Sequence, residues 1–244
     1  MNLVVCCYWW TDADWPAAYN ADHVRQLKDA VRKNLTVPHE FFCLTDDVEA
    51  FEFDHDIRAV PLDLTTAIPG TEFVKLMTFS PAAQAVIGDR ILQLDLDTVI
   101  VGNIDKIVDR EEDTVVWRNP ARLPYGNPVR NRCYYNGSVI LHLAGTLPEV
   151  YTDFHPGYAR KNGGPFPTTQ EWMSDILGPN APYWDASHGV YRLARSDTPG
   201  SGIDGELPAN ACMVCFVGSE HKPWDPKVRA AQPWVENYWP EVLA

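Results

Sequence analysis

Two aspartates, Asp95 and Asp97, interrupt an otherwise apolar run between Arg90 and Val101. In a β-strand, alternation would place both carboxylates on one face and Leu96 on the other. Two like charges beside a core are costly unless a cation lies between them or one carboxylate stays protonated. Mn²⁺ or Mg²⁺ prefers such oxygen ligands and leaves positions open for the phosphate oxygens of a nucleotide. The spacing therefore predicts a metal site at a strand end, although an Asp-x-Asp in a local turn would need no metal.

The overall charge of the chain is strongly acidic. Its 244 residues include 20 Lys and Arg against 33 Asp and Glu, for a formal net charge of −13. Such a surface repels phosphate backbones, so we do not expect nucleic acid as a partner. Hydrophobic residues make up 45% of the chain, which is typical of a folded globular protein and excludes a disordered one. An anionic substrate would need local positive charge from a metal or from a few lysines and arginines.

Short apolar runs alternate with helical patterns along the chain. Most of the runs are continuous, which is typical of strands covered by helices on both faces. They predict strands over residues 3–8, 41–45, 57–62, 90–94, 98–101, 114–117, 138–143 and 211–217. Val24, Leu27 and Val31 recur at helical spacing, after Asn20 or Asp22 as the N-cap. The sequence therefore predicts one α/β domain over residues 1–244, with a mostly parallel central sheet flanked by helices and a small antiparallel addition.

The middle of the chain carries a second helical pattern and two loop-like regions. Phe73, Leu76 and Met77 predict a helix that ends or restarts at Ser80-Pro81. Residues 118–135 and 155–168 are rich in Pro, Gly, Asn and aromatic side chains. Loops of this length usually serve a function, so we expect them to form lids or walls of the site.

The start of the chain has no basic segment, and its apolar run is shorter than a secretory signal or the roughly 20 residues of a membrane span. No later run is long enough to cross a bilayer. Five of the six cysteines lie in strand-like apolar runs, the usual place of reduced, buried thiols. These features predict a soluble cytoplasmic protein without a transmembrane segment.

The segment Leu94–Thr98, followed by Gly102–Asp105, resembles the DxD segment of GT-A fold glycosyltransferases, especially family 8 and its bacterial and phage relatives. Further similar segments follow the family order: Phe42–Asp47, Tyr135–Val139, Thr169–Trp172, and Gly218 with His221–Trp224. The resemblance implies a GT-A-like domain that transfers a sugar from a nucleotide sugar, usually a UDP-sugar, to an acceptor. It also implies retention at the anomeric carbon and Mn²⁺, or Mg²⁺, held by Asp95 and Asp97.

The resemblance also implies partners for the metal and the diphosphate. Family members carry a metal-binding His where this chain has Cys215 or Val217, and His221 follows in a segment one residue longer. His221 is therefore our candidate third ligand, with a solvent-facing loop histidine as the alternative. Lys222 and Lys75 match basic residues that face the donor phosphates, although each would look the same as a surface lysine.

Other residues are assigned to the sugar. Gln170 matches a family glutamine beneath the sugar ring, and we assign it, with Asp97, a catalytic role. Thr169 stands where the family has Asp, and Thr168 with Glu171 also fits an ordinary capping box. Asn136 and Gly137 match a stretch that borders the donor sugar and the acceptor. Asn-Gly before an apolar strand is also a common hairpin turn.

The nucleoside end of the donor is expected at the carboxyl ends of the first two strands, where open α/β sheets bind ligands. Tyr8, Trp10 and Asp46 lie there and could contact the uracil and ribose, whereas aromatic packing in the core is the alternative for both rings. Leu96, between the two aspartates, and Gly218, in the C-terminal motif, complete the predicted donor contacts.

Two other functions fit parts of this pattern. A nucleotidyltransferase could use a related sheet and two acidic ligands, but Tyr8-Trp9-Trp10-Thr11 stands where its Gly-rich, basic phosphate loop would be. A non-catalytic nucleotide-sugar-binding protein would keep the fold and the pocket without turnover. The changes at Thr169 and at the expected metal histidine keep that second alternative open.

Overall fold

The computed structural model describes residues 2–10, 19–62, 72–81, 83–119, 133–193, 202–218 and 221–240. Its strands are β1 (Leu3–Trp9), β2 (His39–Thr45), β3 (Arg58–Pro61), β4 (Arg90–Leu94), β5 (Thr98–Ile100), β6 (Thr114–Arg118), β7 (Tyr135–Leu143), β8 (Tyr183–Trp184), β9 (Val190–Arg192) and β10 (Met213–Cys215). Its α-helices are α1 (Ala21–Asn34), α2 (Ala83–Val86), α3 (Asp105–Val108), α4 (Glu149–Thr152), α5 (Thr169–Leu177), α6 (Pro226–Ala231) and α7 (Val235–Tyr238). Its 3₁₀-helices are η1 (Val48–Phe51), η2 (Glu72–Phe79), η4 (Pro156–Tyr158), η5 (Arg160–Asn162) and η6 (Ala186–His188).

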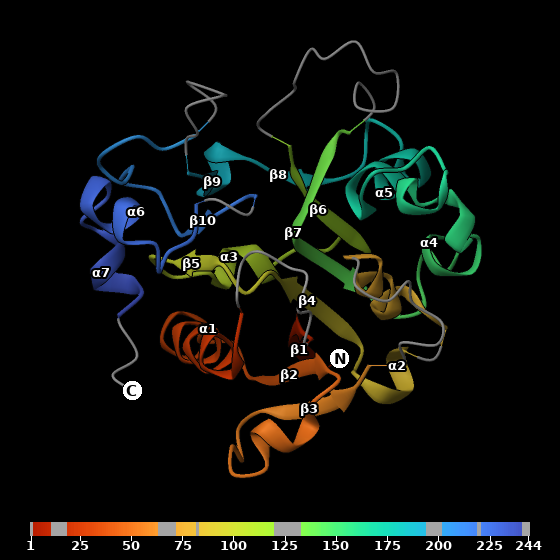
Figure 1. The fold of residues 1–244 in the computed structure, drawn as a ribbon, viewed down its shortest axis with the longest axis horizontal. Helices are drawn as coiled ribbons and strands as arrows, with labels where there is room; N and C mark the ends of the chain where they lie inside the picture. Colours follow the sequence, from red (N-terminus) through yellow and green to blue (C-terminus); the bar gives the residue numbers. More distant parts are fainter. Residues whose placement is uncertain are drawn as a thin grey trace.

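Seven strands form the central sheet in the order β3-β2-β1-β4-β7-β6-β8 (Figure 1). β7 runs antiparallel to its neighbours β4 and β6, while the other neighbouring strands pair in parallel. A second sheet has the order β5-β10-β9, with β10 antiparallel to β5 but parallel to β9. The predicted α/β fold with a mostly parallel central sheet is confirmed, whereas the small sheet is mixed rather than purely antiparallel.

The apolar run of β1 is continuous because both of its faces are covered. Val5 and Cys7 join a core cluster that includes the buried face of α1, whereas Val4 and Cys6 join another cluster on the side of η2. Asn20 is the N-cap of α1. Its side-chain oxygen accepts hydrogen bonds from the backbone N–H groups of Asp22, at 3.0 Å, and His23, at 3.2 Å. The predicted amphipathic helix is confirmed, and of the two candidate N-caps, Asn20 and Asp22, the structure uses Asn20.

The remaining elements refine the sequence prediction. The segment around Phe73 and Leu76 forms the 3₁₀-helix η2 rather than an α-helix, and the chain restarts as α2 after Pro81. β8 and β9 were not predicted, because each is only two or three residues long and no apolar run marks it. The predicted loop at 118–135 lies largely outside the described residues, which omit 120–132. The loop at 155–168 contains η4 and η5.

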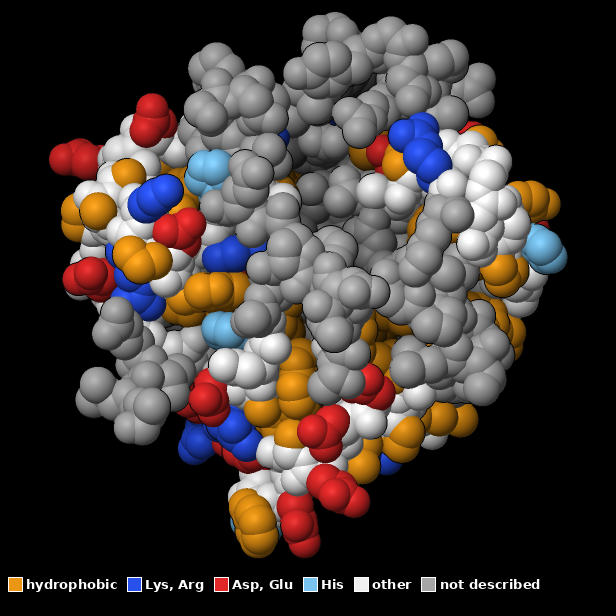
Figure 2. All heavy atoms as spheres, in the orientation of Figure 1, with side chains coloured by type: hydrophobic (Ala, Val, Ile, Leu, Met, Phe, Trp, Pro, Cys, Tyr) orange, Lys and Arg blue, Asp and Glu red, His pale blue; other side chains and the backbone are white. Residues whose placement is uncertain are grey.

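Acidic side chains gather on one edge of the molecule. Figure 2 shows them at the lower edge of the view, over η1 and β3. Glu49, Glu52 and Asp56 are exposed in this segment. This acidic surface repels phosphate groups. The positive charges of Lys75 and Lys222, by contrast, are partly buried and buried. Among the described residues, no helix is long and apolar enough to cross a membrane.

His142 on β7 generates a prediction about acid stability. It is fully buried, its ring stacks on Phe79 at 4.2 Å between centroids, and burial lowers its pKa to about 4. Unfolded His142 takes up its proton near its ordinary pKa of 6.5, so the unfolded state binds more protons between pH 6.5 and pH 4. We expect the free energy of unfolding to fall as the pH falls through this window, by up to about 3 kcal/mol from His142.

Urea unfolding at pH 7.5 and pH 4.5 measures this loss. The difference between the two pH values should be smaller in His142→Phe, which keeps an aromatic ring against Phe79. It should be unchanged in His55→Phe, a control at an exposed histidine. An equal loss in wild type and His142→Phe would contradict the assignment.

Candidate functional site

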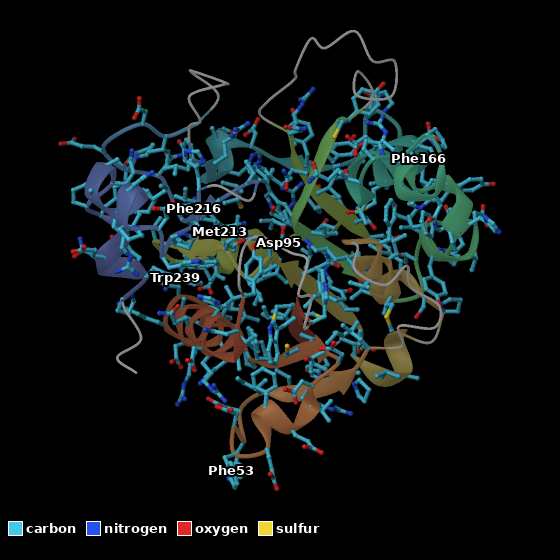
Figure 3. The ribbon with its side chains drawn as sticks, viewed as in Figure 1. Phe53, Asp95, Phe166, Met213, Phe216 and Trp239 are labelled. Carbon is cyan, nitrogen blue, oxygen red and sulfur yellow. The ribbon has the colours of Figure 1, made fainter. Side chains whose placement is uncertain are left out.

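Asp95 and Asp97 lie in the connection between the two sheets. β4 ends at Leu94, and β5 begins at Thr98 in the small sheet. The Thr98 N–H donates to the carbonyl of Asp95 at 3.1 Å, so the segment is a tight turn. The expectation that strand alternation puts both carboxylates on one face was therefore wrong, because the chain leaves the central sheet after Leu94. Figure 3 places Asp95 in the middle of the molecule, beside the small-sheet side where Met213 lies.

The Asp95 carboxylate is partly exposed and forms an ion pair with Lys75. The backbone N–H of Asp95 donates to the carbonyl of Ser138 at 3.0 Å, which fastens the turn to the start of β7. Lys75 is carried by η2, and the hydroxyl of Tyr8 donates to its carbonyl at 2.9 Å. Asp95 is therefore paired with a lysine whose backbone is held by Tyr8 of β1.

The Asp97 carboxylate is buried, with 4% of the residue exposed. Its Oδ2 accepts hydrogen bonds from the Lys222 ammonium and from the Tyr19 hydroxyl, the latter at 2.9 Å. Lys222 is also buried, and its Nζ donates to the Tyr19 hydroxyl oxygen at 2.7 Å. Three residues far apart in the sequence thus form one closed group, which we call the Asp97 triad.

The electrostatics of the Asp97 triad follow from burial. Burial raises the pKa of the Asp97 carboxyl, the Lys222 ammonium opposes that rise, and the negative charge of Asp95 adds to it. Burial also raises the pKa of the Tyr19 phenol well above its ordinary value, and the two aspartates raise it further. Tyr19 therefore stays protonated at neutral pH and acts as a donor to Asp97.

Polar residues lie at the start of β7, which is hydrogen-bonded to the turn, and at the start of α5, which Gly137 contacts. The Asn136 side-chain oxygen accepts from the Ser138 N–H at 2.8 Å, within the bonded stretch that holds Asp95. Gly137 lies against Gln170: a Cβ added at Gly137 would be 3.7 Å from Cγ of Gln170. Because α5 begins at Thr169, Gln170 sits in the first turn of that helix. The structure thus brings Asn136, Gly137 and Gln170 together beside the Asp95 turn.

The start of α5 follows the predicted cap in part. Thr168 is the N-cap, and its hydroxyl accepts from the Gln170 N–H at 3.2 Å. Glu171 contacts the Thr168 hydroxyl rather than the N-cap backbone, so the reciprocal capping box does not form. Thr169, at the position where the resemblance implies Asp, is buried with 2% of its surface exposed.

The donor set of this site fits a hard divalent cation. Asp95 and Asp97 offer two carboxylates. Nδ1 of His221, the predicted third ligand, is buried without a hydrogen-bond partner among the described residues, but His221 does not converge with the two carboxylates. No three His, Cys, Asp or Glu side chains of the described residues already converge as a metal site. Mg²⁺ and similar cations commonly take one or two carboxylates and complete their shell with substrate phosphates, so a cation arriving with a diphosphate fits these residues.

The predicted nucleoside contacts lie in different surroundings. Tyr8 is buried in the core, and Trp10 is partly buried against the same cluster. Asp46 is exposed after the end of β2, and Leu96 is buried in the core. Gly218 is exposed and adopts a φ of +89°, a conformation that favours glycine. Their contacts to a nucleotide stay predictions.

Tyr19 was not predicted from the sequence as a site residue. It lies immediately before the N-cap Asn20 and belongs to none of the motifs. Its ring meets the edge of Trp224 at 5.4 Å between centroids, and Trp224 stacks on His23 at 4.0 Å. The one available signal was its position close to a helix start that follows the first strand, where α/β sheets bind ligands.

No protein-family model and no curated protein matches the sequence. Among solved structures, the galactosyltransferase LgtC in complex with donor and acceptor sugar analogues aligns over 98% of this chain and 97% of its own, with a TM-score of 0.60 and 11% identity. An active-site mutant of LgtC aligns over 96% and 93%, with a TM-score of 0.64 and 11% identity. The fold is that of a GT-A-like glycosyltransferase.

The glycosyltransferase GlyE of Streptococcus pneumoniae TIGR4 shares this architecture. It aligns over 92% of this chain and 57% of its own, with a TM-score of 0.59 and 13% identity. At such identities the likeness concerns the fold. It confirms the fold expected from the DxD-like segment and from the similar segments before and after it.

The Asp97 triad generates a stability prediction. Lys222→Met leaves a buried carboxylate without its ammonium, and Asp97→Asn leaves a buried ammonium without its carboxylate. We expect each change to lower the free energy of unfolding by about 3–5 kcal/mol. The double variant should lose clearly less than the sum, since neither charge remains.

Urea unfolding in the presence of a chelator measures these losses. Lys28→Met is the matched control, because Lys28 pairs with the exposed side chains of Asp29 and Asp56. It should cost only about 1 kcal/mol or less. Additive losses in the double variant would contradict a direct pairing of Asp97 with Lys222.

Proposed function

We propose that this protein is a glycosyltransferase that transfers a sugar from a UDP-sugar to a hydroxyl-bearing acceptor, in a metal-dependent reaction with retention. The observation that carries the proposal is the turn after β4, where two carboxylates meet two lysines. This turn lies in a fold shared with LgtC, whose structure contains donor and acceptor sugar analogues. A site with both carboxylates and ammoniums suits a cation together with the diphosphate that it neutralises.

Asp95 and Asp97 would hold the cation, and His221 would supply a nitrogen ligand. When bound, the cation would neutralise the charge that develops on the leaving diphosphate. Lys75 and Lys222 would contact phosphate oxygens, because their ammoniums already lie at these carboxylates. They supply local positive charge in a chain whose net charge is −13.

Gln170 would lie beside the donor sugar. Its place against Gly137, in the first turn of α5, supports this assignment. In one structural neighbour the mutated active-site residue is a glutamine, which gives further support. For retention we propose a front-side displacement. The acceptor oxygen bonds to the anomeric carbon while the bond from that carbon to the phosphate oxygen breaks, and the leaving phosphate takes the hydroxyl proton.

Trp10 and Asp46 would contact the base and ribose. They follow β1 and β2, which are neighbouring parallel strands, so they lie at the same edge of the sheet. Leu96 and Gly218 would contribute backbone contacts near the diphosphate. Tyr8 would not contact the donor itself. It would hold the backbone of Lys75 in place, through its hydrogen bond to the Lys75 carbonyl.

A nucleotide-sugar-binding protein without turnover is the second candidate. The buried Thr169 at the position of the family Asp favours it, since a threonine supplies no carboxylate to the sugar. Measuring sugar release from UDP-sugars in water, and transfer to added acceptors, separates an enzyme from a binding protein.

Calorimetric titration of UDP with and without Mn²⁺ tests the donor site. We expect wild type to bind UDP only with the cation, and the double variant Asp95→Ala and Asp97→Ala to lose binding. The double variant Asp29→Ala and Asp56→Ala is the control, because it removes the same charge from the Lys28 ion pairs. UDP binding that is unchanged by Mn²⁺ and by the loss of Asp95 and Asp97 would refute the metal-dependent mechanism.

A further inference from the structure

We propose that Lys222 is a movable counter-ion. It pairs with Asp97 in the free protein, and it moves to the donor diphosphate when the diphosphate binds together with its cation. In this proposal, which rests on the proposed function, Tyr19 is the positioning residue that holds Lys222 in its first place. The exchange would make the cation and the diphosphate bind cooperatively.

Lys222 is held at its head group and at its backbone. Nζ donates to Asp97 and to the Tyr19 hydroxyl, and it lies 5.2 Å from the centroid of the Tyr19 ring. The Lys222 carbonyl accepts from the Asp225 N–H at 3.0 Å. The Pro223 carbonyl accepts from Arg229 at 3.0 Å. With the backbone fastened to α6 in this way, the flexible side chain is the part that can change partner.

Tyr19 is well suited to hold an ammonium on a carboxylate. Its ring is fixed between the start of α1 and the turn after Lys222, through the edge contact with Trp224. The Trp9 indole N–H donates to the Tyr19 carbonyl at 3.4 Å, which fixes the backbone. The hydroxyl donates to Asp97 and accepts from Lys222, so one neutral group orients both charges.

Competition at one oxygen atom couples the two ligands. Oδ2 of Asp97 already accepts from Lys222 and Tyr19. A cation that binds this oxygen must displace the ammonium, and alone it would leave two positive charges close together in a buried site. A diphosphate gives the displaced ammonium a new anionic partner. Each ligand therefore lowers the cost of binding the other, which is positive coupling.

Lys222→Met separates this exchange from a merely structural role. The exchange predicts that the variant responds more strongly to Mn²⁺ alone but binds UDP more weakly. Without the ammonium, Asp97 is free for the cation, so Mn²⁺ alone should raise the melting temperature more in Lys222→Met than in wild type. The affinity for UDP in saturating Mn²⁺ should fall by about tenfold or more, since a charge-assisted hydrogen bond to phosphate is lost. A lysine needed only for folding would weaken both responses.

Tyr19→Phe tests the positioning role with the aromatic packing kept. Calorimetry should show Mn²⁺ binding alone about threefold more tightly than in wild type, because Lys222 is held less firmly. The affinity for UDP in Mn²⁺ should fall less than in Lys222→Met. Tyr191→Phe is the matched control, since it removes a hydroxyl that donates to Asn210 at 2.8 Å in the small sheet. It should leave both affinities unchanged.

The outcomes distinguish the two proposals. UDP binding in Mn²⁺ by wild type, together with no stronger Mn²⁺ response in Lys222→Met and Tyr19→Phe, would overturn the exchange and leave the proposed function in place. Failure of wild type to bind UDP in Mn²⁺ would overturn both. UDP binding by wild type with the opposite-sign effects in Lys222→Met supports the exchange.

Discussion

The buried carboxylate of Asp97 is the constraint on which the arrangement of this site depends. A charge withdrawn from water costs several kcal/mol unless it is paired and hydrogen-bonded. Here Lys222 and Tyr19 supply both, and they come from the turn before α6 and from the residue before the N-cap of α1. The turn after β4 can therefore bury its second aspartate only when these three parts of the chain meet. The stacking of Trp224 on His23 strengthens the same junction.

The change of sheet after β4 gives the site its place. β4 belongs to the central sheet and β5 to the small one, so the chain between them lies at the end of a strand with backbone free to turn. Because β7 is antiparallel to β4, its first residues lie beside the last residues of β4. This pairing brings Asn136, Gly137 and, through α5, Gln170 to the turn. Carboxylates and ammoniums thus meet at one turn in the middle of an acidic protein, with an amide nearby, a combination that suits the binding of a cation with a phosphate.

Much of the fold could be predicted from the sequence because most of its strands are buried on both faces. Each of the eight apolar runs corresponds to a strand, since β-branched and other apolar residues are needed wherever two layers pack on a sheet. Asn20 and the apolar stripe of α1 were likewise readable, because capping and helical periodicity are local. β8 and β9 were missed, since a pairing of two or three residues depends on the neighbouring strand rather than on a local pattern. For η2 the sequence predicted a helix without specifying its kind, and the structure has a 3₁₀-helix, because the spacing of its apolar residues suits either kind of helix.

The sequence by itself determined the chemical types at the site: two aspartates one residue apart, lysines near motifs that resemble those of a glycosyltransferase family, and a glutamine at a helix start. The tertiary structure decided which of them meet. Lys222 lies 125 residues from Asp97 and 203 residues from Tyr19 along the chain, so no local pattern could indicate their contact. Strand alternation led us to expect the aspartates on one face of a strand, whereas the change of sheet puts them in a turn and gives Asp95 and Asp97 different lysine partners. Helical periodicity and capping depend on neighbouring residues, so they can be recognised in the sequence. The pairing of buried charges depends on how distant layers pack, and only the folded chain specifies that packing.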